Sequence, residues 1–388
     1  MKKASLCLLL TFVFLLVSCN SESIENTPKN EHDFEKIFQK NFHNGNYGSN
    51  IACENEEGYF FINGSFLYYM EKENLETTLV CNRLECRHNN NACDAFLETN
   101  EIAYYNERLF YLESGKRHTI FSMNLDGSNR REVLSYNTEL SYPSYALNQG
   151  YLYFIENLNL CCVSLENVDK KTKLYEFTES SEAGFFFLWA DADKVYVCTE
   201  NKNYAQVFYE YDLLEGKSKQ IWAADGMEEE WDSKGVAASG WYLDKRILYL
   251  YLNGSGIWKY DITKETYTRI AEIADKKQYG YATFDAEYIY INAADNALNS
   301  QKASEYSLYV YNYQGELVDV ISLDVVNAKR KLSDLSIIGS TSDKVFCTGF
   351  FSEEFEDFSA DSVQDIERMS LFYAPIPNQG KGLIEVEL

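Results

Sequence analysis

The feature that most constrains this fold is a repeated unit of four short β-rich runs. Its clearest copy spans residues 101–136, where aromatic and aliphatic runs are separated by turn-forming residues such as the "DGSNR" of 126–130. Seven copies follow one another from about residue 50 onward, and their second runs begin near Tyr59, Leu109, Leu152, Val195, Leu248, Ile289 and Val345. The steps between these positions are 50, 43, 43, 53, 41 and 56 residues, so a period of about 42 carries three insertions.

A period in the forties with four strands per unit is typical of a β-propeller. The runs are apolar on both alternating faces, as in "RILYLYL" at 246–252, which suits a blade packed between two neighbours. The sequence therefore predicts an all-β protein, a β-propeller of seven blades with four antiparallel strands each, over residues 49–388. A β-sandwich array or two separate domains would not give one period without a linker. We expect the ring to close by packing of the first blade on the seventh, without strand exchange.

Turn residues recur at matching places in the units. Asn and Asp, such as Asn106 and Asp193, lie between first and second runs, where their side chains can hydrogen-bond the turn backbone. Gly127, Gly216 and Gly315 lie between third and fourth runs. The pattern predicts positive φ at these three glycines.

The N-terminal residues have the order of an export signal. Lys2 and Lys3 precede an apolar run over 6–17 that is too short to span a bilayer. The "LVSC" that ends at Cys19 resembles a lipobox, in which cleavage leaves a lipidated cysteine. We expect residues 1–18 to be a lipoprotein signal peptide and the protein to be anchored by Cys19 on the extracytoplasmic side of the cell membrane. A plain secretory signal is the alternative.

The segment that follows Cys19 is polar. Residues 19–48 are rich in Asn, Ser, Glu and Lys, a composition that buries little apolar surface. We interpret them as a flexible tether between lipid and propeller.

The charge of the chain is strongly acidic. The formal net charge is −25, and loss of two lysines with residues 1–18 would make it −27. Such a charge repels nucleic acid and anionic lipid surfaces, so nucleic acid is excluded as a partner class. Partners would be neutral, cationic or metal-bridged, or else the acidity serves solubility alone.

Three cysteines and a histidine gather after the fourth run of the first unit, in the pattern C-x4-C-x-H-x4-C formed by Cys81, Cys86, His88 and Cys93. Three thiolates and one imidazole make a sufficient tetrahedral set for one structural zinc. A disulfide between Cys86 and Cys93 is the rival interpretation in an exported chain, and free thiols are the third. Other cysteines fall within the β-rich runs and read as small buried apolar residues, namely Cys161, Cys162, Cys198 and Cys347.

The insertions all follow fourth runs or join second to third runs, which places them on one face of a propeller. Loops carry function more often than scaffold does, so this face is the candidate binding surface. Its candidate residues outside the Cys/His stretch are His118, Trp231, Phe355 and Phe358. His118 would be a ligand or an acid/base, or simply a solvated loop histidine.

The stretch "LVCNRLECRHNNNACDAF" resembles a loop found in a group of Gram-positive surface lipoproteins with TolB-like propellers. The similarity covers most of the chain from about residue 50. "NLDGSNRRE" at 124–132 is also similar to the strand-turn unit of TolB-like propellers. Because that group has no assigned activity, the resemblance implies location and architecture only.

Two classes of function fit these features. The first is a membrane-anchored extracellular module that binds an unknown protein or glycan ligand. The second is a propeller enzyme, a lyase or hydrolase of extracellular polysaccharide. Its weakness is that the propeller units contain only His88 and His118 as histidines, and no spacing isolates a carboxylate pair. Calcium bound by acidic loops is a third interpretation, but no D-x-[DN]-x-[DN]-G loop is present.

Overall fold

The structure is a computed structural model of the chain. It describes residues 43–44, 52–99, 101–113, 118–137, 144–178, 186–202, 205–224, 238–244, 246–252, 255–272, 278–284, 287–294, 306–341, 344–351, 370–378 and 381–386.

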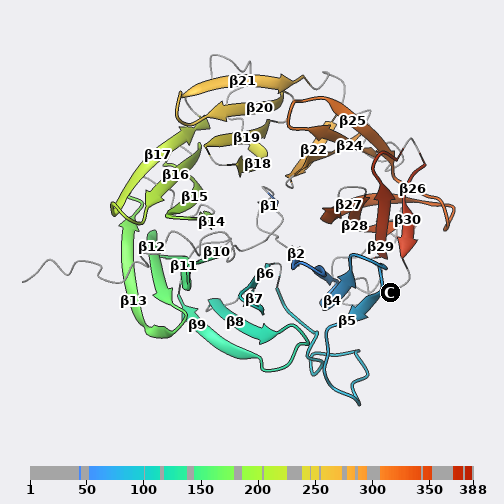
Figure 1. Cartoon of the computed structure of the whole chain (residues 1–388), viewed down its shortest axis with the longest axis horizontal. Helices are drawn as coiled ribbons and strands as arrows, with labels where there is room; N and C mark the ends of the chain where they lie inside the picture. The colour runs from blue at the N-terminus through green and yellow to red at the C-terminus, as the bar shows by residue number, and fades with distance from the viewer. Residues whose placement is uncertain are drawn as a thin grey trace, which may run out of the picture.

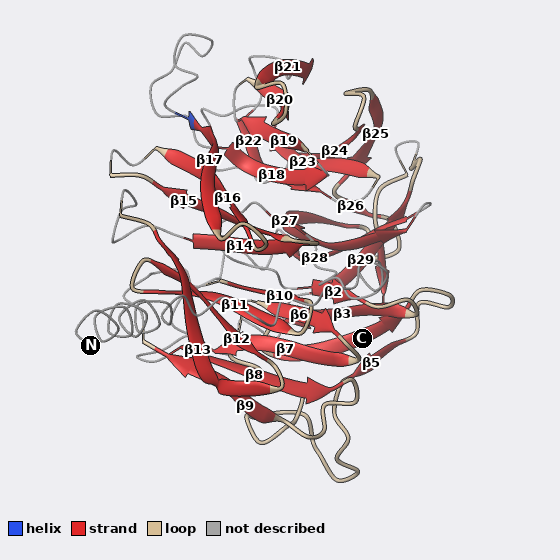
Figure 2. Cartoon of the chain, turned by 60° about the vertical axis from the view of Figure 1, so that its left-hand side comes forward, coloured by secondary structure: helices blue, strands red, loops and turns tan. Residues whose placement is uncertain are grey.

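Seven antiparallel sheets stand side by side in a ring, so the predicted seven-bladed β-propeller is confirmed (Figure 1). Seen obliquely, the described part of the chain is built almost wholly of strands (Figure 2). In chain order, blades one to three comprise β2 (Ala52–Glu54), β3 (Gly58–Asn63), β4 (Phe66–Glu71), β5 (Thr77–Leu79); β6 (Ile102–Tyr105), β7 (Arg108–Glu113), β8 (His118–Asn124), β9 (Arg131–Tyr136); and β10 (Tyr145–Asn148), β11 (Tyr151–Glu156), β12 (Asn159–Ser164), β13 (Asn167–Glu176).

Blades four to seven comprise β14 (Phe186–Asp191), β15 (Lys194–Glu200), β16 (Gln206–Asp212), β17 (Lys217–Ala223); β18 (Ala238–Asp244), β19 (Ile247–Leu252), β20 (Gly256–Asp261), β21 (Thr266–Ala271); β22 (Gln278–Phe284), β23 (Tyr288–Ala294), β24 (Tyr306–Asn312), β25 (Leu317–Ser322); and β27 (Arg330–Thr341), β28 (Lys344–Phe351), β29 (Ser370–Pro375), β30 (Ile384–Val386). All seven predicted second strands are present, from β3 to β28. Two short strands are additional, β1 (His43–Asn44) and β26 (Asp324–Val325).

The apolar core lies between the blades. Strands that are apolar on both faces pack against two neighbours, as the sequence pattern predicts. Blades four and five show this clearly, because the rings of Trp189 and Trp241 meet across their interface with centroids 4.4 Å apart. Aromatic pairs of this kind add to the stabilisation from buried area.

The glycines of the third-to-fourth turns have the predicted positive φ, with values of 82° at Gly127, 64° at Gly216 and 83° at Gly315. At Gly127 the backbone also approaches a neighbouring blade, since a Cβ there would lie 2.6 Å from the carbonyl oxygen of Val80. Only glycine satisfies both conditions without strain.

The ring closes by side-chain packing between blades one and seven. Tyr59 and Phe346 are fully buried there, with ring centroids 5.4 Å apart, and Met70 and Leu371 belong to the same apolar cluster. Within the described strands, neither blade supplies a strand to the sheet of the other. The expected mode of closure is therefore confirmed.

Part of the expected tether lies at the propeller axis. β1 pairs with β22, His43 opposite Phe284 and Asn44 opposite Thr283, on the inner side of blade six (Figure 1). Residues 1–42, with the expected signal peptide, lie outside the described residues. Among those that are described, no helix has the length and apolar character needed to cross a bilayer.

Candidate metal centre

The Cys/His stretch interrupts the fourth strand of blade one. Val80 N–H donates to the carbonyl oxygen of Leu67 at 2.9 Å, and Leu67 N–H donates to the carbonyl oxygen of Ala95 at 2.8 Å. Both ends of the stretch thus bond to one residue of β4. Beyond it the strand pairing continues, because Leu97 N–H donates to the carbonyl oxygen of Ser65. Residues 81–94 therefore form a very large bulge, which we call the arm.

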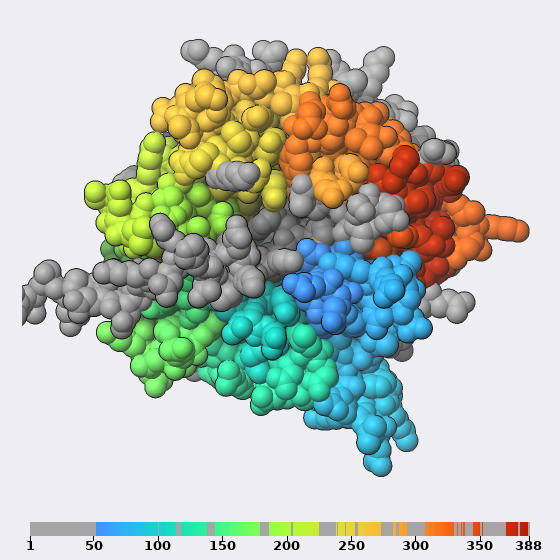
Figure 3. Space-filling view, in the orientation of Figure 1, coloured from blue at the N-terminus to red at the C-terminus, as the bar shows by residue number. Residues whose placement is uncertain are grey.

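The arm projects from the outer rim of the ring. In the space-filling view it is the light-blue lobe that extends beyond blade one (Figure 3). At its base Asn82 donates to Asp126 of the β8–β9 turn at 2.6 Å, which joins the arm to blade two. The sequence predicted a loop after the fourth strand, and the structure shows an excursion that returns to complete that strand.

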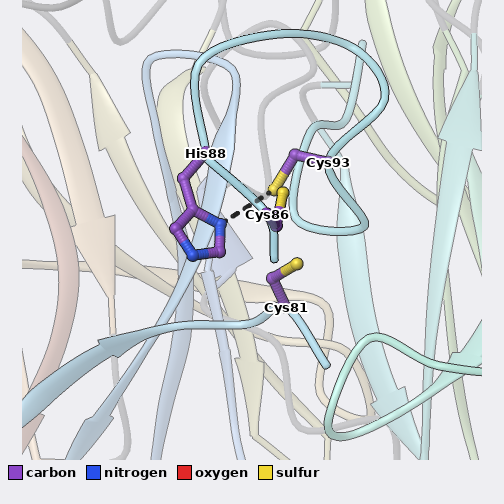
Figure 4. A group of neighbouring side chains, drawn as sticks. All are labelled: Cys81, Cys86, His88 and Cys93. Carbon is purple, nitrogen blue, oxygen red and sulfur yellow. Dashed lines mark hydrogen bonds between the residues drawn. The ribbon is translucent and has the colours of Figure 1, made fainter. Parts of the chain in front are cut away.

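Four candidate ligand atoms converge at the base of the arm (Figure 4). The sulfur atoms of Cys81, Cys86 and Cys93 and one imidazole nitrogen of His88 all lie within 4.8 Å of one another. His88 Nδ1 is 3.4 Å from Cys93 Sγ. Cys93 is buried, Cys81 and Cys86 are half-buried, and His88 is exposed.

Local turns and an ion pair hold the ligands in place. Cys86 N–H donates to the carbonyl oxygen of Arg83 at 3.2 Å, and Cys93 N–H donates to the carbonyl oxygen of Asn90 at 3.1 Å. Each bond closes a tight turn. The guanidinium of Arg83 lies 3.0 Å from the carboxylate of Asp94. His88 has a φ of 53°, an uncommon conformation for a residue with a side chain.

Hydrogen bonds favour the ionised form of one thiol. Burial raises the pKa of Cys81, but donors outweigh it, first the backbone N–H groups of Arg83 and Asp94, so that this pKa lies below the ordinary value. Burial raises the pKa of Cys93 to about 12, although it too accepts a backbone hydrogen bond, from Ala95. Backbone N–H groups aimed at sulfur are the kind of outer contact that orients thiolate ligands.

The donor set fits a tetrahedral metal. Zinc–sulfur and zinc–nitrogen bonds of about 2.3 and 2.0 Å place adjacent ligand atoms about 3.6 Å apart. The 3.4 Å between His88 Nδ1 and Cys93 Sγ is close to that spacing. All eight described cysteines are free thiols, including Cys81, Cys86 and Cys93. The cluster could therefore hold a metal ion.

His118 does not join this cluster. The sequence placed it in a loop, but it is the first residue of β8 and its side chain is only 6% exposed. Its ring lies 5.9 Å from that of Tyr136, its partner across the β8–β9 pair. Burial lowers its pKa.

The other predicted residues of the binding face, Trp231, Phe355 and Phe358, lie outside the described residues, as does the predicted lipidation site Cys19. The shared face therefore stays a prediction. Sequence reasoning missed Glu101, which is 5% exposed and whose pKa burial raises to about 8. The one sequence feature that could have pointed to Glu101 is its position as a carboxylate directly before the apolar run that forms β6.

Comparisons with known proteins support the fold alone. No family model matches the chain, and no curated protein matches it. A solved structure from work on two prolyl endopeptidases aligns with a TM-score of 0.51 and 10% identity, over 88% of this chain and 49% of that one. Dipeptidyl peptidase 4 of Porphyromonas gingivalis aligns with a TM-score of 0.48 and 9% identity, over 86% of this chain and 52% of that one. The chain thus spans about half the length of each of these two chains. The likeness to the prolyl endopeptidase structure is one of fold and indicates no activity.

Proposed function

We propose that the chain is a lipid-anchored lipoprotein on the extracytoplasmic side of the cell membrane, whose propeller is a binding module for a protein or glycan ligand. The anchor is supported by "LVSC" at 16–19. The observation that supports the binding role most directly is the arm. It adds nothing to the sheet of blade one, yet an ion pair between Arg83 and Asp94 links its two ends and it projects from the rim of the ring.

We further propose that one structural zinc sits at the base of the arm, held by Cys81, Cys86, His88 and Cys93. Three thiolates with one imidazole are a usual set for structural zinc, and four protein ligands leave no open position for water. The ion would tie together the two ends of the interrupted strand, because Cys81 follows Val80 directly and Cys93 lies two residues before Ala95. Its role is therefore structural and not catalytic.

Elemental analysis of the full chain, purified in detergent without an affinity tag, tests the zinc. About one zinc per chain is expected, with the arm thiols reduced in a count under denaturing conditions. Cys86→Ser should lose most of the metal, whereas Glu85→Ala, an adjacent change that removes no ligand, should keep it. Absence of metal together with missing thiols would show a disulfide instead.

Two further measurements test the anchor and the module. Cys19→Ala should abolish incorporation of labelled palmitate and release the protein from membranes, and retention of both label and membrane association would contradict the anchor. The labelled full chain should bind a component of an array of extracellular glycans and surface proteins without altering it. New reducing ends or unsaturated products on a bound glycan would show an enzyme instead.

A further inference from the structure

The thiols of the described chain differ in their access to solvent. Of the eight described cysteines six are buried, and the two that are half-buried, Cys81 and Cys86, both belong to the candidate metal centre. The other two members of that centre are the buried Cys93 and the exposed His88 (Figure 4). Because exposure governs which thiols are oxidised, a dissolved oxidant would react with this centre before the other described cysteines.

The three sulfur atoms of the centre are close enough for a disulfide to form without rebuilding the blade. They lie within 4.8 Å of one another. A disulfide needs about 2 Å between its sulfur atoms, so closure requires a movement of roughly 3 Å or less. The arm lies outside the sheet of blade one and can supply that movement.

Two of the three thiols are fixed in place by the sheet. Cys81 and Cys93 lie within two residues of the positions where the arm leaves and rejoins the fourth strand, and both positions are hydrogen-bonded to Leu67 of β4. Cys86 lies between them, on the arm itself. The disulfide that forms with least disturbance therefore includes Cys86.

The segments on its two sides decide the partner of Cys86. On its N-terminal side four residues separate it from Cys81, and one of them, Asn82, is hydrogen-bonded to blade two. On its C-terminal side six residues separate it from Cys93, and a hydrogen bond from Arg83 ties the last of them to the arm itself. The longer segment can shift without moving a blade, so Cys86 and Cys93 are the pair that would close.

We propose that the metal centre of the arm is a redox switch, which hydrogen peroxide converts into a Cys86–Cys93 disulfide with loss of the metal. This inference rests on the zinc proposed above. The thiolate of Cys86 attacks one peroxide oxygen, the O–O bond breaks and hydroxide leaves, which gives a sulfenic acid. The thiolate of Cys93 then attacks that sulfur, the S–S bond forms and a second hydroxide leaves. The two thiolates lose two electrons and the peroxide gains them.

The switch would act on the seam between blades one and two as well as on the arm. Cys81 and His88 would be left as ligands, which is half of the tetrahedral set that zinc needs. The three cysteines pack in an apolar cluster to which both blades contribute, with Val80 from blade one and Met123 from blade two among its members. The arm is also bonded to Asp126 of the β8–β9 turn. Loss of the metal should therefore loosen the arm and this turn together, while the sheets stay paired.

Trypsin makes the switch directly measurable, because cleavage after arginine and lysine places the three cysteines in the separate peptides 73–83, 84–87 and 88–108. The zinc-loaded full chain in detergent is treated with a slight excess of hydrogen peroxide. Bound zinc should fall from about one per chain to near zero, with peptides 84–87 and 88–108 joined by a disulfide. Dithiothreitol with added zinc should reverse both changes. Hydrogen exchange should rise in residues 81–94 and in the β8–β9 turn.

Cys161→Ala is the matched control, because it removes a buried thiol outside the arm and should respond to peroxide as the wild type does. Retention of zinc and thiols under peroxide would overturn the switch, and so would loss of zinc through sulfinic acid without a disulfide. A disulfide that includes peptide 73–83 would overturn the pairing. A chain that binds no zinc before peroxide is added, even after reduction in the presence of zinc, would overturn the proposed zinc itself.

Discussion

At the scale of single residues, Glu101 makes stability depend on pH. Its pKa in the folded chain is raised to about 8, whereas an unfolded glutamate titrates near 4.3. Between these values the folded state holds a proton that the unfolded state has released. Wild-type stability should therefore fall as pH rises from about 4.5 to 8, by at most ~1.4 kcal/mol per pH unit from this group.

Glu101→Gln removes that dependence, because the amide stays neutral at every pH. The stability of the variant relative to wild type should rise steadily from pH 5 to pH 8. Denaturant unfolding at a series of pH values measures it, with Glu73→Gln, at an exposed position, as the matched control. If the difference in the free energy of unfolding between variant and wild type does not change with pH, Glu101 is not held protonated in the folded chain.

Residue types were easier to predict than residue environments. The Cys/His spacing predicted a metal-ligand set, and the four ligand atoms do converge, because their positions within one short loop limit how far apart they can be. His118 was expected in a solvated loop because it follows the polar "SGKR" of 114–117, but it is the first residue of β8 and its ring is buried. Its position directly before the apolar run of β6 does not by itself mark Glu101 as buried, because the groups that contact its carboxyl oxygen, Ser144 and Tyr145 N–H, belong to blade three.

At the scale of elements, the arm should be dispensable for the sheet of blade one. Val80 and Ala95 bond to the same residue, Leu67, so their backbones already lie close together. Replacing residues 81–94 by two glycines should leave a folded propeller that binds no metal. Circular dichroism and elemental analysis would check both points. Aggregation, or loss of the β-sheet signal, would mean that the arm is needed for blade one to form.

The β8–β9 turn depends on a glycine that touches blade one. Gly127→Ala would strain a φ of 82° and also press a methyl group to within 2.6 Å of Val80. We expect a loss of about 2 kcal/mol or more. Gly150→Ala is the matched control, because its φ is 79° but a Cβ there meets nothing within 4 Å, and it should cost only about 1 kcal/mol. If thermal unfolding shows equal losses of stability for the two variants, the contact with Val80 does not contribute to stability.

Strand positions were predictable because each strand has its own pattern of aromatic and aliphatic residues between turn residues. The glycines of the third-to-fourth turns were predictable for the same local reason. The interruption opposite Leu67 was not, since it depends on which residue of β4 pairs with both Val80 and Ala95. The interruption depends on how separate segments pair, and the sequence of neither segment alone indicates that pairing.

At the scale of the whole molecule, we expect the ring to open first at the seam between blades one and seven. The other seams join blades that are consecutive in the chain, so a separated pair stays connected. Among the described residues, blades one and seven are joined by side-chain packing around Tyr59 and Phe346 and share no strand. Opening this seam meets no covalent restraint, and local opening should start there.

Phe346→Ala tests this expectation against a matched change at an internal seam. Phe346 and Phe154 are both fully buried phenylalanines, and truncation of either should cost about 3–5 kcal/mol.

The two variants should differ in where hydrogen exchange increases. Phe346→Ala should speed exchange in β2, β3, β27 and β28 well before global unfolding, because the seam can open while the other blades stay packed. Phe154→Ala should raise exchange more evenly, since its two blades remain joined by the chain and by the polar contacts of Glu101 with Ser144. Uniform exchange in both variants would show that the ring unfolds as one cooperative unit and that covalent continuity does not decide where it opens.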